Sequence, residues 1–225
     1  MKIYKNLIVG FLVIFCISCR DEANQNNHLH QGEVSGQHEL SYNQFLKTVA
    51  NKRHHLKNAE TKKIGDYFFS LLNNDIPQYW TGTIWDFNGT TRIPQQGSIA
   101  CGYFVTNTLS DLGFNIQRIK LAQVVSSEMI KTLCVNVKTI SGFKQFQEYM
   151  NAQPAKSVFI VGLDFHTGYI IKDEKESYFL HSNYIQKKGV TEERIDDSKA
   201  LANSKVYVVG SLTQNKKLLE DWVKH

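Results

Sequence analysis

The chain has 225 residues, of which 42% are hydrophobic, 12% aromatic and 21% charged, with 14 Gly and 3 Pro. This composition excludes collagen, a coiled coil and a wholly disordered chain, and the length is enough for one substantial core. The formal charge of +5 comes from 26 basic and 21 acidic residues. Without Lys2 and Lys5 the excess falls to +3, from 24 basic against 21 acidic residues, which is too small to indicate a nucleic-acid partner.

The first nineteen residues have the layout of an export signal. Lys2 and Lys5 precede the apolar run Leu7–Ile17, which is shorter than the roughly 20 residues of a membrane-spanning helix, so a transmembrane anchor is the weaker interpretation. The segment ending in Ser18-Cys19 resembles the cleavage box of bacterial lipoproteins, in which the cysteine receives the lipid. We therefore expect residues 1–19 to be a lipoprotein signal peptide and Cys19 to anchor the protein in a membrane of the bacterial cell envelope, periplasmic or surface-exposed. A plain secreted protein is the alternative.

Residues 20–39 have few side chains that suit a hydrophobic core. They are rich in Asn, Gln, His and Gly, which predicts a flexible tether. Their three histidines, His28, His30 and His38, are more typical of a solvated linker than of a metal-binding tract. The remaining residues, 40–225, are expected to form a single domain.

Helical signals come first within that domain, in a region of about residues 40–75. Phe45, Val49 and Leu56 recur at helical intervals, and a second helix is predicted over 60–72, ended by Asn73-Asn74-Asp75 and Pro77. Residues 79–97 contain several glycines and aromatic residues and are predicted to be a long loop. Loops of this length in a domain are usually functional.

Strand signals dominate the second half of the chain. Helices are predicted over 101–112, 126–133 and 141–150, with a last helix after Thr213. Strands are predicted over 135–137, 157–163, 167–171, 177–180 and 205–212. Helices followed by antiparallel strands indicate an α+β fold, because alternating βαβ units are absent from the pattern.

We expect one cysteine and two histidines to lie close together in the fold. Cys101 begins a predicted helix, whose N-terminus stabilises a thiolate and an oxyanion. His166 enters one strand and His181 ends the next, so the turn between these strands brings them to the same end. A cysteine nucleophile needs a base, and the base needs a group that orients it.

Each of these residues has an unremarkable alternative. A cysteine near a helix start is usually a small buried side chain, and a histidine at a strand end is usually a surface residue. The three together favour a cysteine enzyme. A disulfide between Cys101 and Cys134 is the remaining rival, since an exported protein meets an oxidising compartment.

These motifs resemble those of the NlpC-type papain-like cysteine peptidases, a family of bacterial cell-wall endopeptidases and amidases. The matching segments cover about Ile76 to Leu212 and read Tyr79-Trp80-Thr81-Gly82, Ala100-Cys101-Gly102-Tyr103-Phe104, His166-Thr167-Gly168-Tyr169 and His181-Ser182-Asn183. The chain departs from the family at Ala100, where the family has an acidic residue. It departs again at Gly102-Tyr103, where the family has Ser-Gly.

The resemblance implies a papain-like fold, with N-terminal helices on a mostly antiparallel sheet. It implies that Cys101 is the nucleophile, His166 the general base and His181 the orienting group. Asn183 is a second candidate orienter, since residues two apart on a strand share a face.

The resemblance further implies a substrate cleft, at Tyr79, Trp80 and Gly102. The expected function is cleavage of an amide bond, first of all in peptidoglycan stem peptides, with no metal or cofactor. The alternatives are a protease, amidase or acyl transferase acting on another amide, or a non-catalytic surface lipoprotein that binds glycan or protein.

Overall fold

The computed structural model describes residues 41–224. The expected signal peptide with Cys19, and the tether with its three histidines, lie outside the described residues. None of the helices within 41–224 is both long and apolar enough to cross a membrane.

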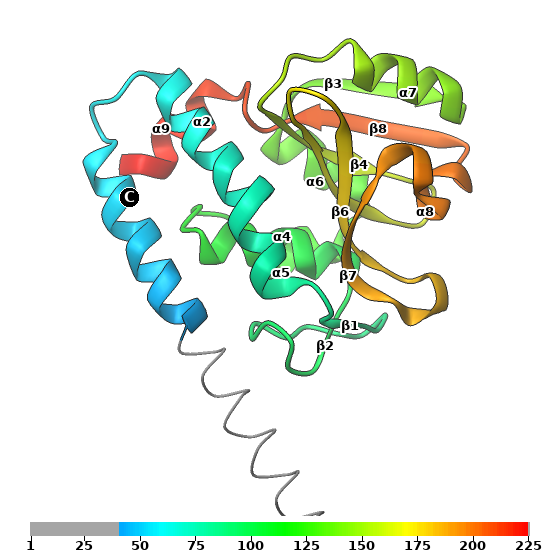
Figure 1. Ribbon diagram of the computed structural model, residues 1–225, viewed down its shortest axis with the longest axis horizontal. Helices are drawn as coiled ribbons and strands as arrows, with labels where there is room; N and C mark the ends of the chain where they lie inside the picture. The colour runs from blue at the N-terminus through cyan, green and yellow to red at the C-terminus, as the bar shows by residue number, and fades with distance from the viewer. Residues whose placement is uncertain (1–40, 225) are drawn as a thin grey trace, which may run out of the picture. The chain divides into compact units, whose positions relative to one another are not determined.

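Helices flank a single large sheet (Figure 1). Residues 41–55 are helical, and they are followed by α2 (Thr61–Ser70), the π-helical turn η1 (Leu71–Asp75) and α3 (Ile76–Trp80). The helices after the first loop are α4 (Cys101–Asp111), α5 (Arg118–Gln123), α6 (Ser126–Leu133), α7 (Phe143–Asn151), α8 (Lys199–Ala202) and α9 (Lys216–Lys224). Two 3-10 turns, η2 (Ile185–Lys187) and η3 (Ile195–Asp197), flank strand β7.

The large sheet has six strands in the order β3-β8-β4-β5-β6-β7, and every neighbouring pair is antiparallel. The strands are β3 (Val135–Ser141), β4 (Ser157–Gly162), β5 (Thr167–Lys172), β6 (Ser177–Asn183), β7 (Gly189–Arg194) and β8 (Val206–Ser211). Two short strands, β1 (Ile84–Trp85) and β2 (Ser98–Ile99), pair in parallel within the loop region. The predicted α+β class is therefore confirmed.

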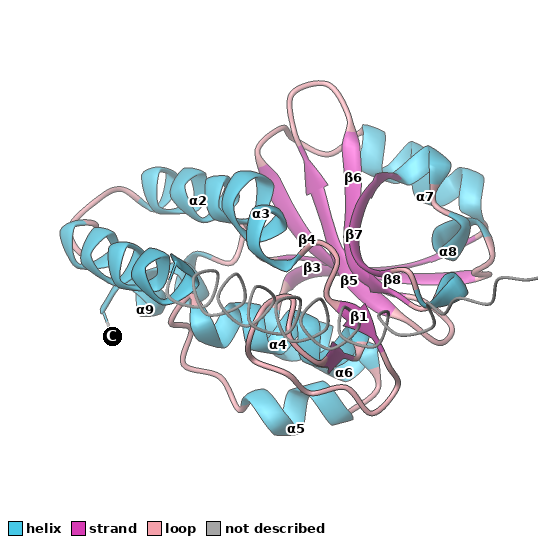
Figure 2. Cartoon of the chain, turned by 60° about the horizontal axis from the view of Figure 1, so that its bottom comes forward, coloured by secondary structure: helices cyan, strands magenta, loops and turns pink. Residues whose placement is uncertain are grey.

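The centre of the sheet is buried on both faces, so its central strands β4 and β5 are largely continuous apolar runs. In β4, Val158 and Ile160 pack into the core beneath α2, α4, α6 and α9, whereas Phe159 and Val161 pack into the core beneath α7 and α8. Figure 2 shows these two helical layers on opposite sides of the sheet. Helix α4, which begins with Cys101, belongs to the first layer.

The helix predicted over 60–72 does not end at Asn73-Asn74-Asp75. It continues through η1 into α3 and ends at Trp80, so the expected stop was wrong. Pro77 is the second residue of α3, directly after the π turn, in which the Ile76 N–H bonds to Leu71 O. The wider π turn accommodates the polar residues without ending the helix.

Among the elements that were not predicted from the sequence, α5 and β7 contribute most to the site, while β1, β2 and α8 are shorter elements that were also missed. Helix α5 lies in the long segment between the first loop and β3, and strand β7 forms one edge of the sheet. The sequence of β7, Gly189-Val190-Thr191-Glu192-Glu193-Arg194, carries three charged residues in a row. Charged side chains are common on edge strands, but they remove the apolar alternation that predicts a strand.

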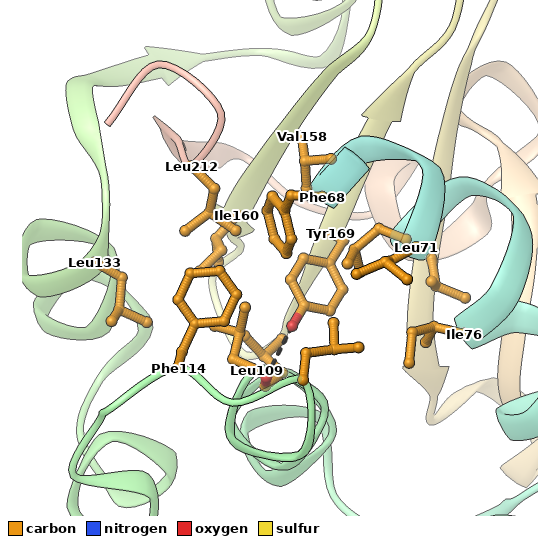
Figure 3. Packing of buried hydrophobic residues seen from close by; sticks show 14 of the residues in the cluster. Phe68, Leu71, Ile76, Leu109, Phe114, Leu133, Val158, Ile160, Tyr169 and Leu212 are labelled. Atoms are coloured by element: carbon orange, nitrogen blue, oxygen red, sulfur yellow. Dashed lines mark hydrogen bonds between the residues drawn. The ribbon is translucent and has the colours of Figure 1, made fainter. Parts of the chain in front are cut away.

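Tyr169 connects the sheet to helix α4. Its side chain is completely buried in the first core, and its hydroxyl donates a hydrogen bond of 2.8 Å to the backbone oxygen of Val105 (Figure 3). The Thr108 hydroxyl lies 2.8 Å from the same Tyr169 oxygen. Since Tyr169 lies on β5 and Val105 on α4, these contacts fix the helix relative to the strand.

Replacing Tyr169 by Phe is expected to lower the free energy of unfolding by about 1–2 kcal/mol, because a buried hydrogen bond is lost. Tyr178→Phe on the neighbouring strand β6 is the matched control. The Tyr178 hydroxyl makes a 3.3 Å contact to Glu176 at a partly exposed site, so its loss is expected to cost less than about 0.5 kcal/mol. Urea denaturation of both variants measures the difference, and equal losses would contradict this account of Tyr169.

Candidate active site

Cys101 is the first residue of α4. Ala100 precedes it in an extended conformation, and the first hydrogen bond within the helix runs from Phe104 N–H to Ala100 O at 2.8 Å. The N–H groups of Cys101 and Gly102 therefore have no acceptor inside the helix. They lie beside the Cys101 thiol and act to lower its pKa.

Gly102 allows helix α5 to approach α4 closely. A Cβ atom at this residue would lie 2.5 Å from the backbone oxygen of Ala122, a distance that real Cβ atoms do not tolerate. This packing explains why a glycine follows the cysteine at the place where the NlpC pattern has serine. The segment before Cys101 is also fixed, since the buried Ser182 hydroxyl donates a 2.7 Å hydrogen bond to Ile99 O.

His166 and His181 are in direct contact. The Nε2 atom of His166 lies 2.7 Å from Nδ1 of His181, and both side chains are buried. The Phe179 ring stacks on His181 with ring centroids 3.9 Å apart. Gly168 makes this approach possible, because a Cβ atom there would lie 2.7 Å from the Cβ of His181.

Glu193 extends this pair to a third residue that the sequence analysis missed. Its Oε1 atom lies 3.2 Å from Nε2 of His181. In the register of β6 and β7, His181 faces Thr191, and Glu193 lies two residues further on the same face of the sheet. The alternation of β7 would have indicated Glu193, but only after β7 itself had been recognised. We refer to His166, His181 and Glu193 as the His–His–Glu chain.

The His–His–Glu chain assigns the tautomer of each ring. An ionised carboxylate only accepts hydrogen bonds, so Nε2 of His181 carries the hydrogen that points to Glu193. The Nδ1 atom of a neutral His181 is then an acceptor, and His166 donates to it through Nε2. This leaves Nδ1 of His166 without a proton, as a base requires.

Burial keeps both imidazoles neutral. It lowers the pKa of His166 well below its ordinary value, and the proximity of His181 lowers it further. Burial also lowers the pKa of His181, although the hydrogen bond and charge of Glu193 act in the opposite direction. For Glu193, burial acts to raise the pKa, but hydrogen bonds from His181 and Ser198 hold it below the ordinary value. At neutral pH the carboxylate is therefore the charged member.

The thiol of Cys101 is also neutral at rest. Burial raises its pKa, and the backbone N–H groups of Thr167, Gly102 and Cys101 only partly offset that effect. The helix N-terminus, which we expected to stabilise a thiolate, does act to lower this pKa, but by less than burial raises it. Cys101 and Cys134 are both free thiols, so the alternative of a disulfide between them is wrong. Burial raises the pKa of Cys134 to about 12.

Two cavities meet at Cys101. The larger, of about 640 Å³, extends toward the loop after α3, and the smaller, of about 240 Å³, extends toward the start of α6. Both are lined by Cys101, Gly102, Ala122, Phe165 and His166. The nucleophile and base candidates therefore lie where a substrate crossing from one cavity to the other would place its central bond.

Three of the predicted site residues are elsewhere. Trp80 is fully buried in the core, where its Nε1 donates to the Tyr42 hydroxyl at 3.0 Å, and Tyr79 stacks on Phe45 with centroids 4.9 Å apart. Neither residue lines either cavity, because helix α3 turns both toward the helical layer. Asn183 accepts the backbone N–H of Ile185 at 2.9 Å, whereas His181 occupies the place beside His166.

Comparison with known proteins found no matching family model, no similar curated protein and no similar solved structure. Within residues 41–224, no group of three or more His, Cys, Asp and Glu side chains is placed to hold a metal ion.

We expect the rate of Cys101 alkylation by iodoacetamide to rise with pH. The midpoint of this rise should lie above the pKa of a free cysteine, because burial disfavours the thiolate. Peptide mass spectrometry across a pH series measures each cysteine separately. Cys134, which is buried with a pKa of about 12, serves as the internal control and is expected to react far more slowly. A plateau of Cys101 reactivity below pH 7 would show instead a resting thiolate.

Proposed function

We propose that this domain is a cysteine hydrolase of the bacterial cell envelope that cleaves an amide bond in peptidoglycan stem peptides. The observation that carries the proposal is that Cys101 and His166 share the junction of two cavities, while the far nitrogen of His166 is held by His181. The resemblance to NlpC-type peptidases and the lipoprotein-like signal supply the substrate class and the location. Lipidation at Cys19 would hold the enzyme at a membrane near its substrate.

In the acylation step, Nδ1 of His166 takes the thiol proton while the sulfur of Cys101 attacks the carbonyl carbon. The two groups are neutral at rest, so the proton moves as the carbon–sulfur bond forms rather than beforehand. The N–H groups of Cys101 and Gly102 donate to the oxyanion. The imidazolium of His166 donates through Nε2 to His181, and the Glu193 carboxylate stabilises the positive charge through that ring.

His166 then gives its proton to the leaving nitrogen, the carbon–nitrogen bond breaks, and a thioester remains on Cys101. Water attacks the thioester carbonyl, His166 accepts a proton from that water, and the carboxylic acid leaves as the thiol is restored. An amine in place of this water would make the same site an acyl transferase.

A non-catalytic binding protein is the second candidate, and one observation favours it. Phe87 and Phe165 line the larger cavity with side chains that are 79% and 97% exposed. Exposed aromatic rings commonly stack on sugars or dock partners. The activity test described next separates this candidate from the hydrolase.

The full chain is expected to release cleaved stem peptides from purified muropeptides, and Cys101→Ala is expected to reduce the rate at least about 10³-fold, because it removes the nucleophile. Mass spectrometry of the products identifies the bond that is cut. Cys134→Ala is the matched control, since Cys134 lines neither cavity. Unchanged cleavage by Cys101→Ala would refute the mechanism, and binding without cleavage by the unmodified chain would favour the second candidate.

Glu193→Gln is expected to lower kcat about 10- to 100-fold, or 1.4–2.8 kcal/mol in activation free energy, with little change in KM. A glutamine side chain can donate to Nε2 of His181, which would reverse the tautomers and place a hydrogen on Nδ1 of His166. The pH profile of kcat should change as well, since the charge that stabilises the imidazolium is gone.

Glu192→Gln is the matched control for this prediction, because Glu192 lies on the opposite face of β7. The same loss in both variants would indicate a general effect on β7 rather than a positioning function of Glu193.

A further inference from the structure

The larger cavity is lined by aromatic and neutral polar side chains. Its aromatic members are Trp85, Phe87, Tyr103, Phe165 and Tyr184, and its neutral polar members include Asn88, Thr90 and Gln123. None of the described residues that line it carries a formal charge at neutral pH, since burial keeps His166 neutral. The cavity therefore offers apolar faces and side-chain amides, but no cation.

The aromatic rings lie next to the reacting groups. Tyr184 lies edge to face with His166, with ring centroids 5.0 Å apart, and Trp85 lies 6.3 Å from Tyr184. On the other side, Gln123 Nε2 donates a 3.1 Å hydrogen bond to the Tyr103 hydroxyl. A group bound here is in contact with these rings at the point where its amide reaches Cys101.

Two cations near this cavity, Arg118 and Lys188, have polar partners. Arg118 donates a 2.6 Å hydrogen bond to the side-chain oxygen of Asn107 and lies over the Tyr103 ring, and Lys188 lies 3.8 Å from Glu193. Neither Arg118 nor Lys188 lines the cavity. Recognition of a carboxylate normally uses Arg or Lys, and burying a carboxylate without such a partner is unfavourable.

The smaller cavity has a negative charge at its wall, at the exposed residue Asp164. Asp164 is its one formally charged member among the described lining residues. The Asp164 carboxylate accepts backbone hydrogen bonds from Lys205 at 2.9 Å and Val206 at 3.3 Å, which hold the negative charge in place.

We propose that this cleft selects substrates without a free carboxylate next to the scissile amide. Stem peptides contain such carboxylates unless they are amidated, so, resting on the proposed function, the preferred substrate is an amidated stem peptide. The specificity lies in the larger cavity, whose aromatic faces bind the neutral part of the substrate beside Cys101.

A pair of alkylating reagents tests this selectivity without any substrate. Iodoacetamide and iodoacetate have nearly the same shape and differ by one negative charge. We expect the ratio of their rates at Cys101 to exceed the ratio measured for N-acetylcysteine at least about tenfold, because the site offers no cation and holds Asp164 close by. A ratio equal to or below that of N-acetylcysteine overturns the proposal.

Two lysine variants of the full chain locate the effect. Gln123→Lys places a cation in the larger cavity and keeps a donor for the Tyr103 hydroxyl, so it is expected to lower the ratio several-fold. Asn203→Lys adds the same charge at an exposed residue that lines neither cavity, and it is expected to leave the ratio unchanged. Equal changes in both variants would assign the effect to net charge and overturn the proposal.

Two muropeptides that differ only in amidation of the carboxylate beside the scissile bond extend the test to catalysis. The amidated form is expected to have a kcat/KM at least about tenfold higher, a factor of ten being 1.4 kcal/mol. Equal values, or a preference for the free carboxylate, overturn the proposal. If neither muropeptide is cleaved, the proposed peptidoglycan activity fails, whereas the alkylation ratio still decides the charge selectivity.

Discussion

The hydrogen bond from the Tyr169 hydroxyl to Val105 is the contact on which the candidate site depends. Tyr169 follows His166 by three residues on β5, and Val105 follows Cys101 by four residues on α4. The separation of Cys101 and His166 is therefore set inside the core, where Tyr169 is fully buried, and not by the loops that carry the cavity walls. Loops around such a core can change without disturbing the cysteine and histidine.

Two histidines can be buried side by side here because both rings are neutral and the group contains a single charge, that of the Glu193 carboxylate. Both rings are neutral, each donates to the next acceptor, and the negative charge lies on Glu193, whose side chain is 16% exposed and close to Lys188. A resting ion pair between thiolate and imidazolium would instead place two charges in a buried site. The site thus holds a neutral thiol and a neutral imidazole, and under the proposed mechanism charge separates only when a carbonyl is attacked.

The sequence was sufficient to predict those helices and strands whose own hydrophobic periodicity determines their structure. Helix α4 and the strands β4, β5 and β6 have clear periodicity, and the turn between β5 and β6 places His166 beside His181. Glu193 could not be predicted, because β7 is stabilised by pairing with β6 and its own residues lack an apolar pattern. Trp80 shows the same limit, since an aromatic residue in a glycine-rich segment is compatible with both a cleft and a core. Trp80 is placed in the core only because the helix continues through η1 into α3.

The NlpC pattern that this chain resembles meets different packing constraints at its two glycines. Gly168 keeps the pattern because a Cβ atom there would lie 2.7 Å from the Cβ of His181. Gly102 departs from it because α5 approaches within van der Waals distance of α4. The cavity walls come from the loop of residues 85–90 and from Phe165 and Tyr184, which contribute little to either core. Charge recognition therefore changes most easily in these walls, and a neutral cleft is compatible with the proposed cysteine–histidine mechanism.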